Sequence, residues 1–224
     1  MDQIPRKIFI WSFFNALAIC LVTIFYLLEE FTITIISYYV IMSILFLVLL
    51  GIVNDYWKNY GVANLLSIFR FSVVMIAFLV SDNLILLGIS LILNLTIDFI
   101  DGPLARKLNE DNAFGSALDN EIDSILVYVA ILYLYSISTL NILGPVAGLL
   151  RYIYIIWIFV MKYTITTEAA SLRAKAIGTN FNVAIILVYL FESIPLFTGY
   201  FYVSTLAVLT SFGKDMFGLY LINK

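Results

Sequence analysis

The chain has 224 residues, a hydrophobic content of 63%, a charged content of 12% and a formal net charge of −3. A soluble domain is about 25% charged, so the composition excludes an ordinary soluble domain and predicts an integral membrane protein. Histidine is absent and Cys20 is the single cysteine, which excludes a Ser-His-Asp triad, a Cys/His metal cluster and an internal disulfide. A metal site or a general base must therefore be built mainly from carboxylates, which suit magnesium, calcium or manganese.

Eight apolar segments follow one another along the chain, each close to the length of about 20 residues that crosses a bilayer as a helix. They cover residues 8–28, 32–53, 65–81, 84–103, 115–135, 140–161, 177–192 and 196–213. The first segment is too long for the core of a signal peptide, and its small residues lie in mid-segment, so we expect an uncleaved helix. The predicted fold class is an all-α integral membrane protein with about eight transmembrane helices.

The basic residues sort onto one side of this eight-span arrangement. All of the twelve Lys and Arg residues except Arg151 fall on the side of the N-terminus, whereas the opposite side carries acidic residues such as Asp82 and Glu192. By the positive-inside rule, we expect both termini to face the cytoplasm.

A polar and aromatic segment, NDYWKNYGVAN at residues 54–64, interrupts the apolar pattern after the second span. We interpret it as the internal boundary of the chain. Residues 1–53 are predicted to form two additional transmembrane helices, and residues 54–224 a domain with a six-helix core.

Four aspartates lie in or beside the fourth and fifth spans, within the stretch DFIDGPLARKLNEDNAFGSALDNEID at residues 98–123. Asp98 and Asp101 are three residues apart, and Asp119 and Asp123 are four apart, so each pair shares one helix face. Because a short polar connection joins the two spans, we expect antiparallel neighbouring helices whose carboxylate pairs face each other near the membrane surface.

These four carboxylates need a cationic partner. An ionised aspartate deep in a bilayer costs about 2.5–3.5 kcal/mol, so four cost roughly 10 kcal/mol before their mutual repulsion is counted. Two divalent ions about 3.5–4 Å apart and bridged by shared carboxylates would offset this cost. Hard oxygen ligands favour Mg²⁺, with Mn²⁺ or Ca²⁺ as substitutes.

Small and basic residues between the two aspartate pairs suit a phosphate-rich ligand. Gly102 and Gly115 allow a ligand to approach the backbone, and Arg106 offers a guanidinium fork to phosphate oxygens. Helix packing is the alternative explanation for either glycine, because small residues also bring membrane helices together.

The stretch matches the pattern D-x2-D-G-x2-A-R-x8-G-x3-D-x3-D at every fixed position. It resembles the signature of the CDP-alcohol phosphotransferases, also called CDP-alcohol phosphatidyltransferases, which are integral membrane enzymes of phospholipid synthesis. Upstream, NLLSIFR at residues 64–70 resembles that family's N-x-L-T-x-x-R, with Ser67 in place of threonine. The resemblance covers roughly residues 54–213.

The resemblance implies that a phosphatidyl-type group moves from a CDP-linked lipid, typically CDP-diacylglycerol, to an alcohol acceptor, with release of CMP. Asp98, Asp101 and Asp119 would bind two divalent ions. Asp123 would complete this site and deprotonate the acceptor hydroxyl. The residues implied to line the CDP pocket are Gly102, Ala105, Arg106 and Gly115, with Asn64 and Arg70 as weaker candidates.

The same resemblance makes residues 54–224 the catalytic domain and implies a homodimer. The active site would face the cytoplasm, and we expect lipid partners but no nucleic acid. Serine, inositol phosphate, glycerol phosphate, choline and ethanolamine are all compatible with the motif as acceptors.

Some residues depart from the motif or lie outside it. Pro103 lacks a backbone donor, so we expect the fourth helix to kink or end there. Arg151, midway along the sixth span, could bind an anionic group of the acceptor, pair with a carboxylate or extend to the surface. Arg173 and Lys175 could bind the acceptor or simply belong to a positive-inside loop.

Two other functional classes also use carboxylates within the membrane. An intramembrane prenyltransferase also uses aspartates and magnesium around a diphosphate, but with other aspartate spacings. A transporter could use buried carboxylates as relay groups, but the paired broken helices typical of such folds are not found in the sequence.

Overall fold

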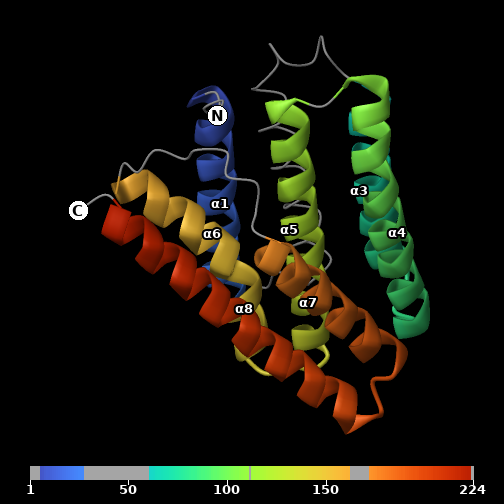
Figure 1. Cartoon of the computed structure of the whole chain (residues 1–224). Coiled ribbons are helices and arrows are strands. Elements are labelled where there is room, and N and C mark those ends of the chain that lie inside the picture. The colour runs from blue at the N-terminus through green and yellow to red at the C-terminus, as the bar shows by residue number, and fades with distance from the viewer. Residues whose placement is uncertain (1–5, 28–60, 111, 162–171, 223–224) are drawn as a thin grey trace.

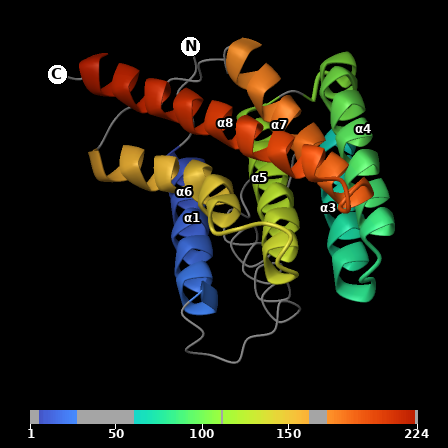
Figure 2. The ribbon, with the colours of Figure 1, turned by 90° about the horizontal axis from the view of Figure 1, so that it is seen from below.

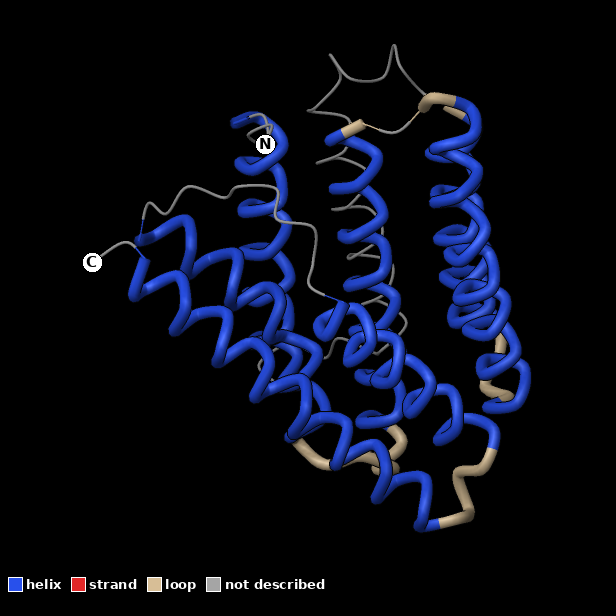
Figure 3. Tube along the Cα trace, viewed as in Figure 1, coloured by secondary structure: helices blue, strands red, loops and turns tan. Residues whose placement is uncertain are grey.

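The computed structural model describes residues 6–27, 61–110, 112–161 and 172–222, and within these ranges all regular structure is α-helical (Figure 3). The helices, labelled in Figure 1, are α1 (Arg6–Leu27), α3 (Val62–Val80), α4 (Leu84–Leu108), α5 (Ala113–Ser136), α6 (Leu143–Met161), α7 (Leu172–Leu190) and α8 (Pro195–Ile222). The predicted all-α class is confirmed.

The predicted spans agree with these helices except at their ends. Each of the seven predicted spans in the described ranges corresponds to one helix, although α7 starts five residues early and α8 continues to Ile222. The span predicted at residues 32–53 and the boundary segment at 54–60 lie outside the described residues.

Five of the described helices, namely α1, α3, α4, α6 and α8, are long and apolar enough to cross a membrane. α5 carries Asp119, Glu121 and Asp123 in its first half and does not belong to this group. It lies inside the bundle, between α1 and the pair of α3 and α4 (Figures 1 and 2). Neighbouring helices cover most of its side chains, so the acidic first half of α5 lies within the bundle.

α3, rather than a direct contact, connects the two helices that carry the aspartates. It packs extensively against both α4 and α5, whereas the described residues of α4 and α5 make few contacts with each other. The expected antiparallel arrangement of α4 and α5 is present (Figure 1), but few direct contacts join the two helices. The sequence reasoning used only the shortness of their connection and overlooked the helix that precedes them.

The connection between α4 and α5 is closely tied to its surroundings. Asn109 ends α4 in the left-handed conformation, with φ 56°, and the Glu110 amide donates to the Ala105 carbonyl over 2.9 Å. This is a helix-terminating arrangement that satisfies carbonyl groups of the last turn. The Glu110 carboxylate then accepts from the amide of Ala63 at 3.2 Å, which caps the start of α3.

α4 does not end at Pro103, contrary to one of the outcomes expected from the sequence. Pro103 lies inside the helix, which continues to Leu108. Proline cannot donate to the carbonyl four residues earlier, but the rest of the last turn forms normally. Ala105 and Arg106 are consequently presented on a helix rather than on a loop.

Gly148 sets how closely α6 approaches α5. A Cβ atom at this position would lie 2.5 Å from Cδ2 of the buried Tyr128 ring. Since real Cβ atoms do not tolerate such a distance, the two helices pack at a separation that only glycine permits.

We predict that Gly148→Ala lowers the free energy of unfolding by about 1–3 kcal/mol, because it overpacks this contact. Gly199→Ala in α8 is the matched control, since a Cβ there meets no heavy atom within 4 Å. The control should be neutral or slightly stabilising, given the higher helix propensity of alanine. Thermal unfolding in detergent measures both, and equal midpoints would contradict the packing argument.

Candidate active site

The four motif aspartates converge on one guanidinium group, that of Arg70 in α3. Nη1 of Arg70 lies 2.9 Å from Oδ1 of Asp98 and 2.8 Å from Oδ1 of Asp123. Nε lies 3.5 Å from Asp101, and Nη2 lies 3.5 Å from Asp119. The predicted clustering of the carboxylates is therefore what the structure contains, but the cation at its centre is a side chain. We call Arg70 and these four aspartates the carboxylate cluster.

Burial differs across the carboxylate cluster. The Arg70 side chain has an exposed fraction of 0%, and Asp101 is also buried. About a third of each of the other three aspartate side chains is exposed, with Asp123 at 36%. The cluster thus has a closed side at Arg70 and Asp101 and an open side where a ligand can reach carboxylate oxygens.

Ser67 extends the carboxylate cluster by one hydroxyl group. Its Oγ lies 2.5 Å from Oδ1 of Asp119 and 3.4 Å from Oδ2 of Asp101. Because the hydroxyl has one hydrogen, it can donate to only one of these carboxylates at a time. Ser67, at the position where the family pattern has threonine, thus connects carboxylates of α4 and α5 through α3.

The charge of the cluster is not balanced. Within the part of the chain that the structure describes, every ion pair of these four carboxylates is with Arg70. One positive charge therefore faces four negative charges near the end of apolar helices, an arrangement that is costly at this depth. The excess negative charge and the all-oxygen donor set both fit divalent cations of the magnesium type.

Arg70 leaves part of the carboxylate donor set for a cation. Among the described residues, no three acidic, cysteine or histidine side chains form a ready-made metal-binding group. The ion pairs of Asp98, Asp119 and Asp123 with Arg70 use Oδ1, so Oδ2 of each carboxylate could serve as a ligand to a divalent cation.

Gly102 and Arg106 lie beside each other at the end of α4. A Cβ on Gly102 would meet only the Nη1 atom of Arg106, at 3.7 Å, so the backbone here is open. Arg106 is exposed and Ala105 is partly exposed. The structure thus leaves a guanidinium and an accessible backbone one helical turn beyond Asp101.

Asn64 and Gly115, also expected at the nucleotide pocket, instead contact each other between α3 and α5. A Cβ on Gly115 would lie 2.7 Å from Oδ1 of Asn64, and both residues are buried. The amide of Gly115 donates to the side chain of Asn112, which caps α5. In this structure, helix packing accounts for Gly115.

Three basic residues were expected to be candidates for acceptor binding. Among the described ion pairs, none joins these residues to the four motif aspartates. Arg151 pairs with Glu121 of α5 at 2.9 Å, which is the carboxylate partner that the sequence left as an alternative. Arg173 pairs with Asp215 of α8 at 3.0 Å, and both are exposed. Lys175 is exposed in the first part of α7.

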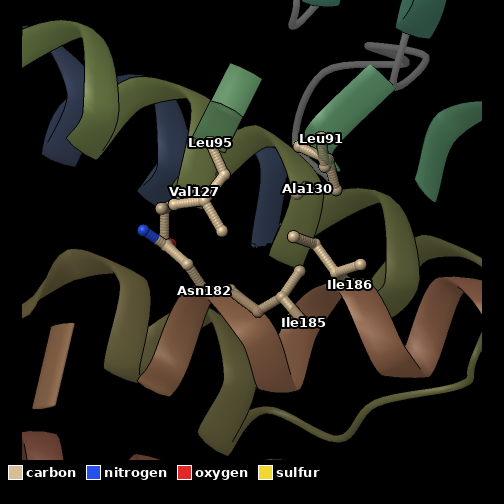
Figure 4. Close-up of a pocket in the computed structure, with 7 residues that line it drawn as sticks. All are labelled: Leu91, Leu95, Val127, Ala130, Asn182, Ile185 and Ile186. Atoms are coloured by element: carbon tan, nitrogen blue, oxygen red, sulfur yellow. The ribbon is translucent and has the colours of Figure 1, made fainter. Parts of the chain in front are cut away.

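An apolar hollow lies next to the carboxylate cluster, between α4, α5 and α7 (Figure 4). Its lining residues are Leu91, Leu95, Val127, Ala130, Asn182, Ile185 and Ile186. Leu95 is three residues before Asp98, and Val127 is four after Asp123, so the hollow is about one helical turn deeper. It has no ionisable side chain and therefore cannot itself perform acid–base or metal chemistry.

Sequence reasoning missed two features of this region. It treated Arg70 as a weak ligand-binding candidate and not as the central partner of the aspartates. It also passed over Glu121, although the same insertion cost that singled out the aspartates applies to a glutamate in the fifth span.

Comparison with known proteins agrees with the motif. Residues 60–212 match the family model described as CDP-alcohol phosphatidyltransferase. This range contains every fixed residue of the motif and begins after α1. An uncharacterized protein of Aquifex aeolicus (strain VF5) is 39% identical over 74 residues, which are 32% of this chain and 38% of that protein. The match therefore spans well under two thirds of that relative's length.

We predict that Arg70→Met lowers the free energy of unfolding by about 3 kcal/mol in EDTA, because the carboxylates lose their shared cation. Added Mg²⁺ should restore part of the loss by screening the same charges. Arg106→Met is the control, because its exposed guanidinium should change stability by about 0.5 kcal/mol at most. Thermal unfolding with and without Mg²⁺ measures this, and an Arg70→Met protein as stable as wild type in EDTA would refute it.

Proposed function

The chain belongs to the CDP-alcohol phosphatidyltransferase family, and we propose that it transfers a phosphatidyl-type group from CDP-diacylglycerol to a small alcohol. The observation that best supports this proposal is the convergence of all four motif aspartates, from two separate helices, on one cluster with an open side.

Members of this family use divalent metal ions. We propose that Asp98, Asp101, Asp119 and Asp123 hold two Mg²⁺ ions, with Mn²⁺ or Ca²⁺ as substitutes, because these carboxylates carry the excess negative charge of the site. When bound, the ions would supply positive charge to offset the charge that develops on the pyrophosphate.

Asp123 is proposed as the general base. About a third of its side chain is exposed, as in Asp98 and Asp119, so an alcohol can come within the hydrogen-bond distance that proton transfer requires. The hydroxyl proton passes to Asp123 as the alcohol oxygen bonds to the lipid-side phosphorus. The bond from that phosphorus to the bridging oxygen breaks, and CMP leaves with the bridging oxygen.

The CDP group is proposed to lie at the end of α4. Arg106 is exposed beside the open backbone of Gly102 and Ala105, where its guanidinium can donate to diphosphate oxygens. Asn64, Gly115 and Arg70 are buried and are proposed to support this pocket by packing rather than by contact with the nucleotide.

For the acceptor, we favour Arg173 and Lys175 over Arg151. Both are exposed near the start of α7 and could hold a phosphate or carboxylate group. Arg173 pairs with Asp215, but both side chains of that pair are exposed, so a ligand could displace Asp215 at small cost. Arg151 is already engaged by Glu121, on the face of α5 opposite the aspartates, and would have to leave that partner to bind an acceptor.

The chain is an integral membrane protein, and we propose that its active site and both termini face the cytoplasm. The starts of α1, α3 and α5 and the end of α4 lie at one end of the bundle (Figure 1), the end that carries Arg106 and Lys107. The aspartates lie six to ten residues from these helix ends, or about 10–15 Å. Division at residue 53 into two additional helices and a catalytic domain, and assembly as a homodimer, are parts of the same proposal.

The proposed function predicts CMP release by the purified protein with CDP-diacylglycerol and Mg²⁺ when the correct alcohol is supplied. The assay would test serine, inositol phosphate, glycerol phosphate, choline and ethanolamine, with EDTA as a control. Release with one alcohol, lost in EDTA, would establish the reaction. Absence of both CMP release and CDP-lipid binding would refute the proposal and return the aspartates to the transporter hypothesis.

We expect Asp123→Asn to fold and to bind the CDP-linked lipid, while the rate of CMP release falls by about 10²–10⁴-fold, the usual contribution of a general base. Asparagine keeps the shape of the side chain but cannot accept the proton. Lipid binding and CMP release would be measured on the same preparation. Near-normal turnover in this variant would remove Asp123 as the base.

A further inference from the structure

α1 contributes buried polar groups to the bundle although it lies before the range that the family model matches. Asn15 has an exposed fraction of 1% and Thr23 of 0%, in a helix that is otherwise largely apolar. A polar side chain buried within membrane-spanning helices is costly unless it forms hydrogen bonds. The partners of these two residues therefore show what α1 contributes.

Asn15 donates a hydrogen bond to the buried member of a partly buried ion pair. Its Nδ2 donates to Oε2 of Glu121 over 2.6 Å, while Nη2 of Arg151 lies 2.9 Å from Oε1 of the same carboxylate. The Glu121 side chain has an exposed fraction of 0%. These three residues come from α1, α5 and α6, and we call them the rear network.

The rear network and the carboxylate cluster lie on opposite faces of α5. Glu121 is two residues from both Asp119 and Asp123, and at 100° per residue it points roughly 180° away from the direction midway between them. Arg70 of α3 thus contacts one face of α5, while Arg151 of α6 contacts the other.

This arrangement opposes rotation of α5 about its axis. Apolar side chains can slide past one another at small cost, whereas a buried carboxylate that loses its partners carries a penalty of several kcal/mol. Rotation would break the contacts of Glu121 and would also move both aspartates. Carboxylates that bind metal or substrate must be held to within about 0.5 Å by their surroundings.

We propose that Asn15, Glu121 and Arg151 are positioning residues that fix α5, and with it Asp119 and Asp123, for reaction. α1 thereby helps to position active-site residues, in addition to packing against the bundle. The inference rests on the proposed function, and it gives Arg151 a role that needs no contact with the acceptor.

The test is Asn15→Leu in the full chain, with Thr23→Val as the matched control. Thr23 also joins α1 to α5, because Oη of Tyr128 donates to its Oγ1 over 2.8 Å, but it lies about two turns farther from the aspartates. Both substitutions remove one hydrogen bond between the same two helices and replace a polar side chain by an apolar one. Thr23→Val also removes the bond from the Thr23 hydroxyl to the Ile19 carbonyl within α1, which makes it a stringent control for lost stability. The two variants differ in whether the lost bond between helices reaches the rear network.

The expected result is a fall of about 10-fold in kcat for CMP release by Asn15→Leu, with little change in KM for the CDP-linked lipid. Affinity for Mn²⁺, measured by electron paramagnetic resonance of the free ion, should weaken by about 10-fold, as when outer partners of metal ligands are removed. Thr23→Val should change neither quantity, even if its thermal-unfolding midpoint falls by a similar amount. Glu121→Gln, which keeps the side-chain volume, should act in the same direction as Asn15→Leu.

Equal losses in the Asn15→Leu and Thr23→Val proteins, in proportion to their stability and with unchanged Mn²⁺ affinity, would overturn the inference and reduce α1 to a support for folding. Should Asn15→Leu fail to fold, wild-type Mn²⁺ affinity and kcat in Glu121→Gln would overturn it equally. A wild-type protein that binds Mn²⁺ but releases no CMP would instead count against the proposed function, and the Mn²⁺ comparison would still decide the role of the rear network.

Discussion

The contact between Arg70 and four aspartates is the constraint on which the rest of the bundle depends. Its carboxylates come from two helices that have few direct contacts, so the site exists only because α3 packs against both. The Arg70 guanidinium is fully buried and pairs with aspartates of both helices. α3 therefore packs between α4 and α5 and also supplies the positive charge that faces their carboxylates. Polar contacts at this depth are costly to leave unsatisfied, and they therefore fix how the apolar helices assemble.

The sequence predicted which carboxylates gather at the site better than how the helices bring them together. The spacing of Asp98, Asp101, Asp119 and Asp123 was sufficient to place each pair on one helix face, since helical periodicity alone determines this. It could not indicate that Arg70 would lie between the pairs, because that contact depends on how α3 packs. Glu121 was visible in the sequence, but Asn15 as its partner, 106 residues away, follows only from the tertiary arrangement.

Segment composition predicted where helices form but not where they end. Hydropathy located α4, yet α4 continues past Pro103 because the last turn is completed by Asn109 and Glu110. The same pattern located α5, whose acidic first half lies among neighbouring helices that cover most of its side chains. At the end of α4, tertiary contacts outweigh the local sequence signal.

The short connection at residues 109–112 has a consequence for anyone who wishes to label this protein. Surface loops usually accept inserted tags, because their backbone is exposed and makes few hydrogen bonds with the rest of the protein. Here three of the four residues have a structural role. Asn109 ends α4 in the left-handed conformation, the Glu110 carboxylate caps the start of α3, and the Asn112 side chain caps α5. An epitope or fluorophore inserted there would separate three helix ends at once, so topology mapping is better directed elsewhere in the chain.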